Sequence, residues 1–154
     1  MAVKVDVPYQ RSFTVAREPE FVFAYFKDVT KAVPENFPGV EEFQPIGTDR
    51  YRWVFEKIGY SSYELRIRLA TQFQFDAPKR ITAIPIPEPD GCLFTGSWDF
   101  TAEGSGTKVT FDAKFEIELP IPGFLKSMAA PIAQTELKKL FDRYIDRVEK
   151  NLAK

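Results

Sequence analysis

The sequence predicts an α+β fold in which a curved antiparallel sheet of about seven strands packs against a long C-terminal helix. The first observation is a series of stretches in which apolar and polar residues alternate, as in strands with one buried face. The second is the close spacing of turn signals between residues 40 and 119, which favours antiparallel pairing of consecutive strands. The third is an apolar stripe at helical spacing near the C-terminus. Because a one-sided sheet must bury its apolar face, this helix is its expected partner.

The N-terminal part of the chain predicts one strand followed by two short helices. Alternation from Tyr9 to Ala16 indicates the strand, and apolar residues at helical spacing indicate a helix from Glu20 to Asp28. Thr30 is a candidate cap for the second helix, which Pro34 and Pro38 are expected to end soon. Together the two helices should form a compact wedge beside the sheet.

The middle of the chain predicts six further strands. The stretch from Tyr63 to Phe75 alternates most clearly and is interpreted as one strand, and Val109 to Leu119 repeats the pattern. The stretch from Ile81 to Pro87 contains two prolines, which cannot donate to a strand ladder, so we expect regular pairing only to about Ile84.

The C-terminal segment from Pro122 to Leu152 predicts the long helix, which Pro131 should kink or split because it removes one backbone hydrogen bond. The apolar stripe consists of Leu137, Leu140, Phe141, Tyr144, Val148 and Leu152. The charged residues on its other face are interpreted as mostly solvated.

Length and charge indicate the number of domains and the kinds of partner to expect. A chain of 154 residues without repeats or linkers is expected to form one domain over residues 1–154. Its 21 Lys and Arg against 22 Asp and Glu give a net charge of −1, which argues against a nucleic-acid partner. Because neither an apolar signal-peptide core nor a membrane-spanning run is present, we expect a cytoplasmic protein.

The sequence has no histidine and a single cysteine, Cys92. The absence of histidine removes the commonest general base, the usual catalytic triads and most transition-metal sites. A lone cysteine excludes an internal disulfide and a multi-cysteine zinc site, and Cys92 is interpreted as a small core residue. We therefore expect no metal, no cofactor and no catalytic residue.

Three stretches carry a family resemblance that extends over nearly the whole chain. They are Phe13–Phe23 at the first strand–helix junction, Asp28–Val40 in the helical wedge, and Gly96–Phe100 with Gly106–Phe111 in a late hairpin. In order and spacing they resemble the helix-grip fold of the START-like (SRPBCC) superfamily. The chain looks most similar to small bacterial proteins of the polyketide cyclase/dehydrase type and of the type named after the G subunit of carbon monoxide dehydrogenase. This resemblance implies an internal apolar cavity.

The strand phases place many aromatic residues, and no Asp or Glu, on the inward-facing side. We therefore expect the protein to bind or carry a hydrophobic small molecule such as a lipid, a fatty acid or a polyketide-like compound. Small residues at Gly96 and Ala113 favour residual space for it. The candidate ligand-binding residues are Trp53, Phe55, Tyr63, Leu65, Ile67, Phe94, Trp98, Phe111, Phe115 and Tyr144.

Two other functions stay open at this point. One is a cyclase or aromatase that acts mainly by holding a reactive chain in a productive shape. The other is an assembly or interaction protein, which would need an exposed apolar patch. For the candidate ligand residues, too, simple core packing is the alternative interpretation, and the oligomeric state is open.

A cavity entrance is expected where the third, fifth and seventh strands end, because these strands run in the same direction. Ile86, Ile121 and Phe124 are the candidate entrance residues, and a transient contact with a membrane surface would bring ligand to them. The alternative is that the prolines around Ile86 and Ile121 only terminate strands and discourage edge pairing.

Overall fold

The computed structural model describes residues 3–60, 63–88, 91–119 and 121–153, without the side chains of residues 58–60 and 63–65. Strand β1 (Val3–Val15) leads into helices α1 (Pro19–Lys27) and α2 (Val29–Asn36). After the remaining strands, a 3₁₀ turn, η1 (Gly123–Leu125), leads into the long helix α3 (Lys126–Leu152). The remaining strands are β2 (Val40–Gly47), β3 (Arg50–Phe55), β4 (Ile58–Tyr60), β5 (Tyr63–Leu65), β6 (Arg68–Asp76), β7 (Arg80–Ile86), β8 (Leu93–Glu103) and β9 (Gly106–Leu119).

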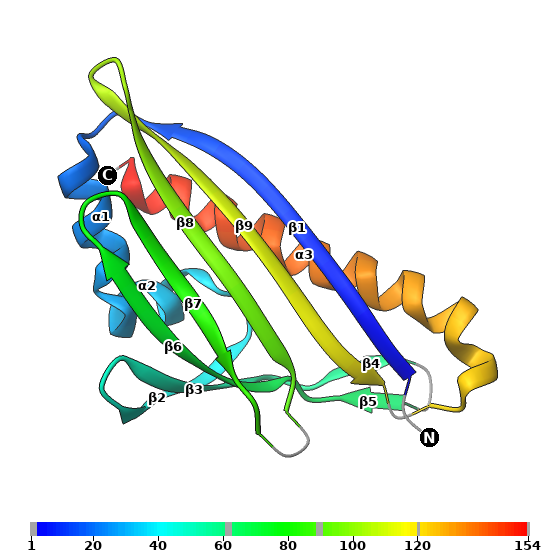
Figure 1. Cartoon of the computed structure of the whole chain (residues 1–154). Coiled ribbons are helices and arrows are strands. Elements are labelled where there is room, and N and C mark those ends of the chain that lie inside the picture. The colour runs from blue at the N-terminus through cyan, green and yellow to red at the C-terminus, as the bar shows by residue number, and fades with distance from the viewer. Residues whose placement is uncertain (1–2, 61–62, 89–90, 120, 154) are drawn as a thin grey trace.

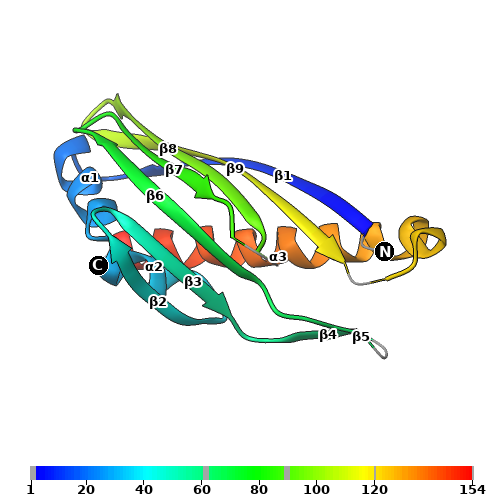
Figure 2. The ribbon, with the colours of Figure 1, turned by 60° about the horizontal axis from the view of Figure 1, so that its bottom comes forward.

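Seven strands form one antiparallel sheet in the order β1-β9-β8-β7-β6-β3-β2, and β4 and β5 form a separate hairpin. Figure 1 shows α3 crossing one face of the sheet, with α1 and α2 packed at one end. Figure 2 shows the sheet curving around this helix. We call the face toward α3 the inner face and the opposite one the outer face. The architecture confirms the predicted α+β fold and its two short helices after the first strand.

Strand β1 begins six residues earlier than the alternation from Tyr9 indicated. Val3, Val5 and Val7 are buried at every second position and continue the inner face toward the N-terminus. Pro8 interrupts the sequence pattern but not the strand, where it pairs with Lys114 of β9. An edge strand tolerates proline because one side of its backbone has no partner strand.

The prediction of one continuous strand from Tyr63 to Phe75 was wrong. The chain leaves the main sheet through the β4–β5 hairpin and rejoins it only at Arg68, so Arg66 and Ile67 lie between two strands. Ile67 still contacts β3, because its carbonyl accepts a hydrogen bond from the backbone N–H of Phe55 at 3.0 Å. The alternation alone did not reveal the change of sheet, since the same phase continues through the break.

Three prolines lie inside regular elements, and one of them departs from expectation. The β6–β7 ladder reaches Ile86, and Pro85 pairs with Thr71 although β7 and β8 pair only up to Ala83. Beyond that pair one side of β7 is unpaired, so the missing N–H of Pro85 removes no ladder bond there. Pro34 lies within α2, which ends two residues later at Asn36 and before Pro38, as expected. Pro131 lies within α3 and does not split it.

The cap of α2 also differs from the prediction. The residue that precedes the helix is Asp28, and the Thr30 hydroxyl donates to its carboxylate at 3.1 Å. Thr30 therefore lies inside the first turn, and the helix begins two residues earlier than a Thr30 cap would allow.

Both edges of the sheet carry a proline. Pro8 lies in β1 at one edge, and Pro45 lies in β2 at the other. The β2–β3 ladder is further interrupted by register shifts between Val40 and Glu42 and between Pro45 and Gly47. Neither edge therefore presents an uninterrupted row of backbone donors.

Candidate functional site

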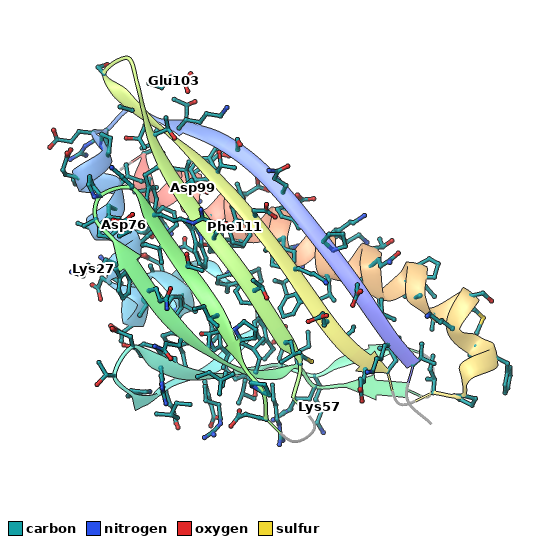
Figure 3. All side chains as sticks on the ribbon, viewed as in Figure 1. Lys27, Lys57, Asp76, Asp99, Glu103 and Phe111 are labelled. Carbon is teal, nitrogen blue, oxygen red and sulfur yellow. The ribbon has the colours of Figure 1, made fainter. Side chains whose placement is uncertain are left out.

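The candidate site is the aromatic interior between the inner face, the α1–α2 wedge and α3. Figure 3 shows side chains filling this space, with Phe111 of β9 among them. Ring contacts connect the sheet to the helix, since the ring centroids of Phe111 and Phe115 lie 5.8 Å and 5.3 Å from that of Phe141 of α3. The predicted ligand residues that are at most 3% exposed are Trp53, Phe55, Ile67, Phe94, Trp98, Phe111, Phe115 and Tyr144. The side chains of Tyr63 and Leu65 lie outside the described residues.

Both buried indoles have hydrogen-bond acceptors. The N–H of Trp53 donates to the Thr71 hydroxyl, and the N–H of Trp98 donates to the Tyr144 hydroxyl, each at 2.9 Å. Burial strongly raises the pKa of Tyr144, so its phenol stays protonated. Among the described residues, no acceptor lies within hydrogen-bonding distance of that proton. The Tyr144 hydroxyl is therefore a buried donor with unused capacity.

The interior is nearly filled. A pocket beside Tyr144 has a volume of about 10 Å³, which is close to the space that one water molecule needs. Its lining residues are Phe26, Val29, Ala32, Val33, Phe73, Ile81, Trp98 and Tyr144.

Gly96, which was expected to leave space, serves packing instead. A Cβ atom on Gly96 would lie 2.9 Å from Cζ of Phe94 and 3.3 Å from Cη2 of Trp98. These two rings occupy the space above Gly96, so its missing side chain makes room for them and not for a ligand.

Phe37 is the central residue that the sequence pattern did not reveal. Its ring stacks on Tyr144 at a centroid distance of 3.8 Å and also contacts Trp53 at 5.2 Å and Phe94 at 6.3 Å. It follows α2 directly and belongs to no alternating strand. The signal that could have found it is an apolar residue directly before a Pro-Gly pair, where the chain must turn inward or expose a ring.

A second pocket, the seam pocket, lies between α3 and the start of β2 and has a volume of about 120 Å³. Gly39 adopts a φ of +77°, which favours glycine, and its carbonyl accepts a hydrogen bond from the backbone N–H of Glu56 at 2.7 Å. The pocket combines apolar walls with a charged rim. Its lining residues are Pro38, Gly39, Phe55, Glu56, Glu136, Lys139, Leu140 and Arg143.

The opposite side of α3 is held to β1 by a polar clamp, the β1 clamp. The hydroxyl of Tyr9 donates to Asp142, and the Arg11 guanidinium pairs with Asp146 at 3.0 Å and Glu149 at 3.3 Å. Burial, followed by the hydrogen bond to Asp142, raises the pKa of Tyr9 to about 12. The clamp therefore fixes one long side of the helix.

The three predicted entrance residues lie in different surroundings. The β6–β7 register places Ile86 opposite Ala70 on the outer face, in the same phase as the exposed Ile84. Ile121 is 5% exposed and belongs to the core, whereas Phe124 is 82% exposed in η1. Figure 1 shows β7 and β9 running in the same direction, as expected.

The structure offers little for metal or thiol chemistry in the part of the chain that it describes. No group of three His, Cys, Asp or Glu residues there could hold a metal ion. Cys92 is buried, and this burial raises the pKa of its thiol to about 11, so it carries little thiolate at neutral pH.

Among the helices of the described ranges, none has both the length and the apolar character needed to cross a bilayer.

Comparison with known proteins supports the fold and identifies a family. The model of a family described as polyketide cyclase / dehydrase and lipid transport matches residues 7–152. No curated protein sequence matches the chain.

Several solved structures have the same fold. The protein TTHA0849 from Thermus thermophilus is 26% identical, with 93% of this chain and 96% of that chain covered and a TM-score of 0.63. A START superfamily protein from Mycobacterium smegmatis is 15% identical, with coverage of 94% and 96% and a TM-score of 0.70. The Zhui aromatase/cyclase from a Streptomyces species is 12% identical, with coverage of 96% and 93% and a TM-score of 0.68. At these last two identities the likeness shows the fold alone.

Proposed function

Because the chain belongs to the polyketide cyclase/dehydrase and lipid transport family, we propose that it binds a hydrophobic small molecule between its sheet and α3. The observation that carries the proposal is the Phe37–Tyr144–Trp98 cluster, which combines stacked rings with one buried hydroxyl whose proton has no described acceptor. Ligand pockets of soluble proteins are commonly apolar with a few placed polar groups, and this cluster has that composition.

Phe37 is the gate of this proposed site. Its ring covers Tyr144, which lines the interior pocket, and the next two residues, Pro38 and Gly39, line the seam pocket. Rotation of Phe37 out of the stack joins the two spaces and adds the volume that its own ring occupied. The ligand enters along the seam, past Phe55 and Leu140, and then occupies the space that the Phe37 ring has left.

Tyr144 supplies the recognition of a polar atom on the ligand. Its hydroxyl already accepts a hydrogen bond from Trp98, which orients its remaining proton toward a carbonyl or hydroxyl oxygen. A net hydrogen bond of this kind contributes about 1 kcal/mol, whereas apolar burial contributes more. About 300 Å² of buried ligand surface gives roughly 7.5 kcal/mol at about 25 cal/mol per Å², before the costs of association and gate opening. Micromolar or weaker affinity follows.

Binding or carriage is favoured over catalysis by the chemistry of the lining. The residues that line the described interior pocket include no carboxylate, and burial of Tyr144 raises its pKa and makes its phenol a donor and not a base at neutral pH. A lipid or fatty acid carried in the cytoplasm would suit such a lining.

Exposed apolar residues in η1 and at the start of α3 support a transient membrane contact as part of the proposal. Phe124 is 82% exposed and Met128 is 56% exposed, one helical turn apart. At this spacing the two side chains could enter a bilayer surface together.

The test compares two cavity variants with a fluorescent fatty acid as the probe. Phe37→Ala removes the gate, and Phe100→Ala removes the same ring beside Phe23 and Phe26 at another place in the core. Each should lower the free energy of unfolding by about 3–5 kcal/mol. Only Phe37→Ala should take up the probe faster and bind it about tenfold more tightly, a difference of about 1.4 kcal/mol.

Equal probe binding by the two variants would contradict the gate and the interior site together. If the alanine variants are too unstable, Phe37→Leu and Phe100→Leu make the same comparison at a smaller loss of stability. In the same assay, Tyr144→Phe should weaken the fatty acid by up to about tenfold and leave a hydrocarbon probe of equal length unchanged.

A further inference from the structure

A larger pocket lies on the outer face of the sheet, separate from the interior. It has a volume of about 380 Å³ and lies over β3 and β6. Trp53 points to the interior, so its neighbour Val54 points outward and forms part of the pocket wall. The lining residues are Glu42, Arg52, Val54, Arg66, Arg68, Glu88 and Gly91.

Glu88, which follows β7, and Gly91, which precedes β8, form one wall of this pocket on the outer face. The N–H of Cys92 donates to the Arg68 carbonyl at 2.8 Å, and the N–H of Gly91 donates to the Glu88 carbonyl at 3.0 Å. Glu88 in turn accepts two hydrogen bonds from the Arg52 guanidinium, and this pairing lowers the pKa of Glu88. Arg52 is therefore already engaged and serves as part of the wall.

Two other arginines in the pocket have donors that are not engaged. Arg66 reaches Glu41 only at 3.7 Å through Nη2, and its buried Nε has no hydrogen-bond partner among the described residues. Arg68 is exposed, and among the described residues no carboxylate lies within 4 Å of its guanidinium. A buried guanidinium nitrogen without a partner is unfavourable unless a ligand or water satisfies it.

The charges around the pocket are nearly balanced. Three arginines line it together with Glu42 and Glu88, and Glu41 lies beside Arg66. The pocket therefore does not attract anions from a distance, and its selectivity rests on the geometry of the free donors. Guanidinium groups bind carboxylate and phosphate oxygens in pairs, which suits a ligand whose anionic group lies between Arg66 and Arg68.

We propose that this outer pocket binds a small organic anion, whose carboxylate or phosphate group is held by Arg66 and Arg68. The volume of about 380 Å³ exceeds what one such group fills, so the body of the ligand lies against Val54 and Gly91. A Cβ atom on Gly91 would lie 3.1 Å from the Glu88 carbonyl, so a side chain there would crowd the wall. This site goes beyond the proposed interior function and does not depend on it.

The test is a nuclear magnetic resonance titration of the full chain with sodium benzoate, sodium phosphate and neutral benzamide, each matched in ionic strength with sodium chloride. Saturable shifts of the backbone amides of Val54, Arg68 and Gly91 with benzoate or phosphate are expected, and the more effective probe identifies the anionic group. Absence of saturable shifts with both anions, or equal shifts with benzamide, would overturn the proposal.

Matched variants separate a specific site from general charge effects. Arg68→Gln should weaken the effective anion about tenfold or more, because it removes charge-assisted hydrogen bonds. Arg66→Lys keeps the charge but removes the buried Nε and should also weaken binding. Glu42→Gln removes a lining carboxylate and should strengthen binding severalfold.

Arg147→Gln removes an exposed cation from α3, on the other side of the sheet, and should change nothing. Equal weakening by Arg68→Gln and Arg147→Gln would overturn the site, because only net charge would then matter. Normal amide spectra of the four variants show that each remains folded.

Discussion

The two long sides of α3 are held in different ways. Toward β1 the helix is fixed by the β1 clamp, in which Arg11 pairs with acidic residues on successive turns. Toward β3 the helix borders the seam pocket. This pocket has a volume of about 120 Å³ and lies between Leu140 of the helix and Phe55 and Gly39 of the sheet side. On this side the helix is held near its C-terminal end, where the Asn151 amide donates to Asn36 of α2 at 2.8 Å and Tyr144 stacks on Phe37. The difference places the less tightly packed side of the helix next to the proposed Phe37 gate.

The largest expected effect comes from filling the seam pocket with a bulkier side chain. Leu140→Trp places a larger side chain in the seam pocket and should oppose the widening that ligand uptake needs. An added barrier of about 1.4 kcal/mol slows uptake of the fluorescent fatty acid about tenfold in stopped-flow measurements. Lys138→Trp, at an exposed position of the same helix, is the control and should leave the rate unchanged. Equal rates in the two variants would mean that ligand does not pass along the seam.

A smaller effect is expected from releasing the clamp. Arg11→Met keeps the aliphatic stem but removes the ion pairs with Asp142, Asp146 and Glu149. Because all four groups are partly exposed, the free energy of unfolding should fall by only about 1 kcal/mol, and by less at high salt.

Urea unfolding at low and high salt measures the effect of releasing the clamp. Arg143→Met, on the seam side, should change stability by less than about 0.5 kcal/mol. A larger loss of stability in Arg143→Met than in Arg11→Met would show that the β1 side does not hold the helix more firmly than the seam side.

The smallest effect concerns Tyr9 at alkaline pH. Its pKa is about 12 in the folded protein and about 10 in an unfolded chain, so the folded state holds this proton more tightly. Its contribution to stability is present below pH 10 and is lost as the pH rises toward 12.

Tyr9→Phe should therefore be about 0.5–1 kcal/mol less stable than the original chain at pH 8. This difference should shrink between pH 10 and pH 12. Tyr25, whose pKa is also raised to about 12, remains in both proteins and cancels from the comparison. A difference that stays constant up to pH 12 would show that the Tyr9 proton contributes nothing to the clamp.

The sheet was the most predictable part of the molecule, because one-sided burial imposes a period of two on the sequence. Every odd-numbered position from Val109 to Leu119 is buried, as the alternation indicated. The burial of Trp53 and Trp98 on the inner face followed from the same phase. The same alternation could have placed Ile86 correctly. Because Ile81 and Ala83 point inward, Ile84 and Ile86 must point outward.

The parts of the structure that could not be predicted depend on contacts between segments whose sequences show no regular hydrophobic spacing. Phe37 belongs to a turn, so its place under Tyr144 depends on how α2 packs against α3. The outer pocket depends on the contacts of Glu88 with Arg52 and of Cys92 with Arg68. In the sequence these arginines are indistinguishable from an ordinary solvated strand face.

The prolines at the two sheet edges bear on whether strands of two copies of the protein can pair at high concentration. An edge strand with free backbone groups can recruit a strand from another copy and begin an aggregate. Pro8 removes one donor from the β1 edge, and Pro45, with the register shifts around it, breaks the row on the β2 edge. Both edges of this aromatic-cored sheet are thereby poorer templates for a strand of a second chain.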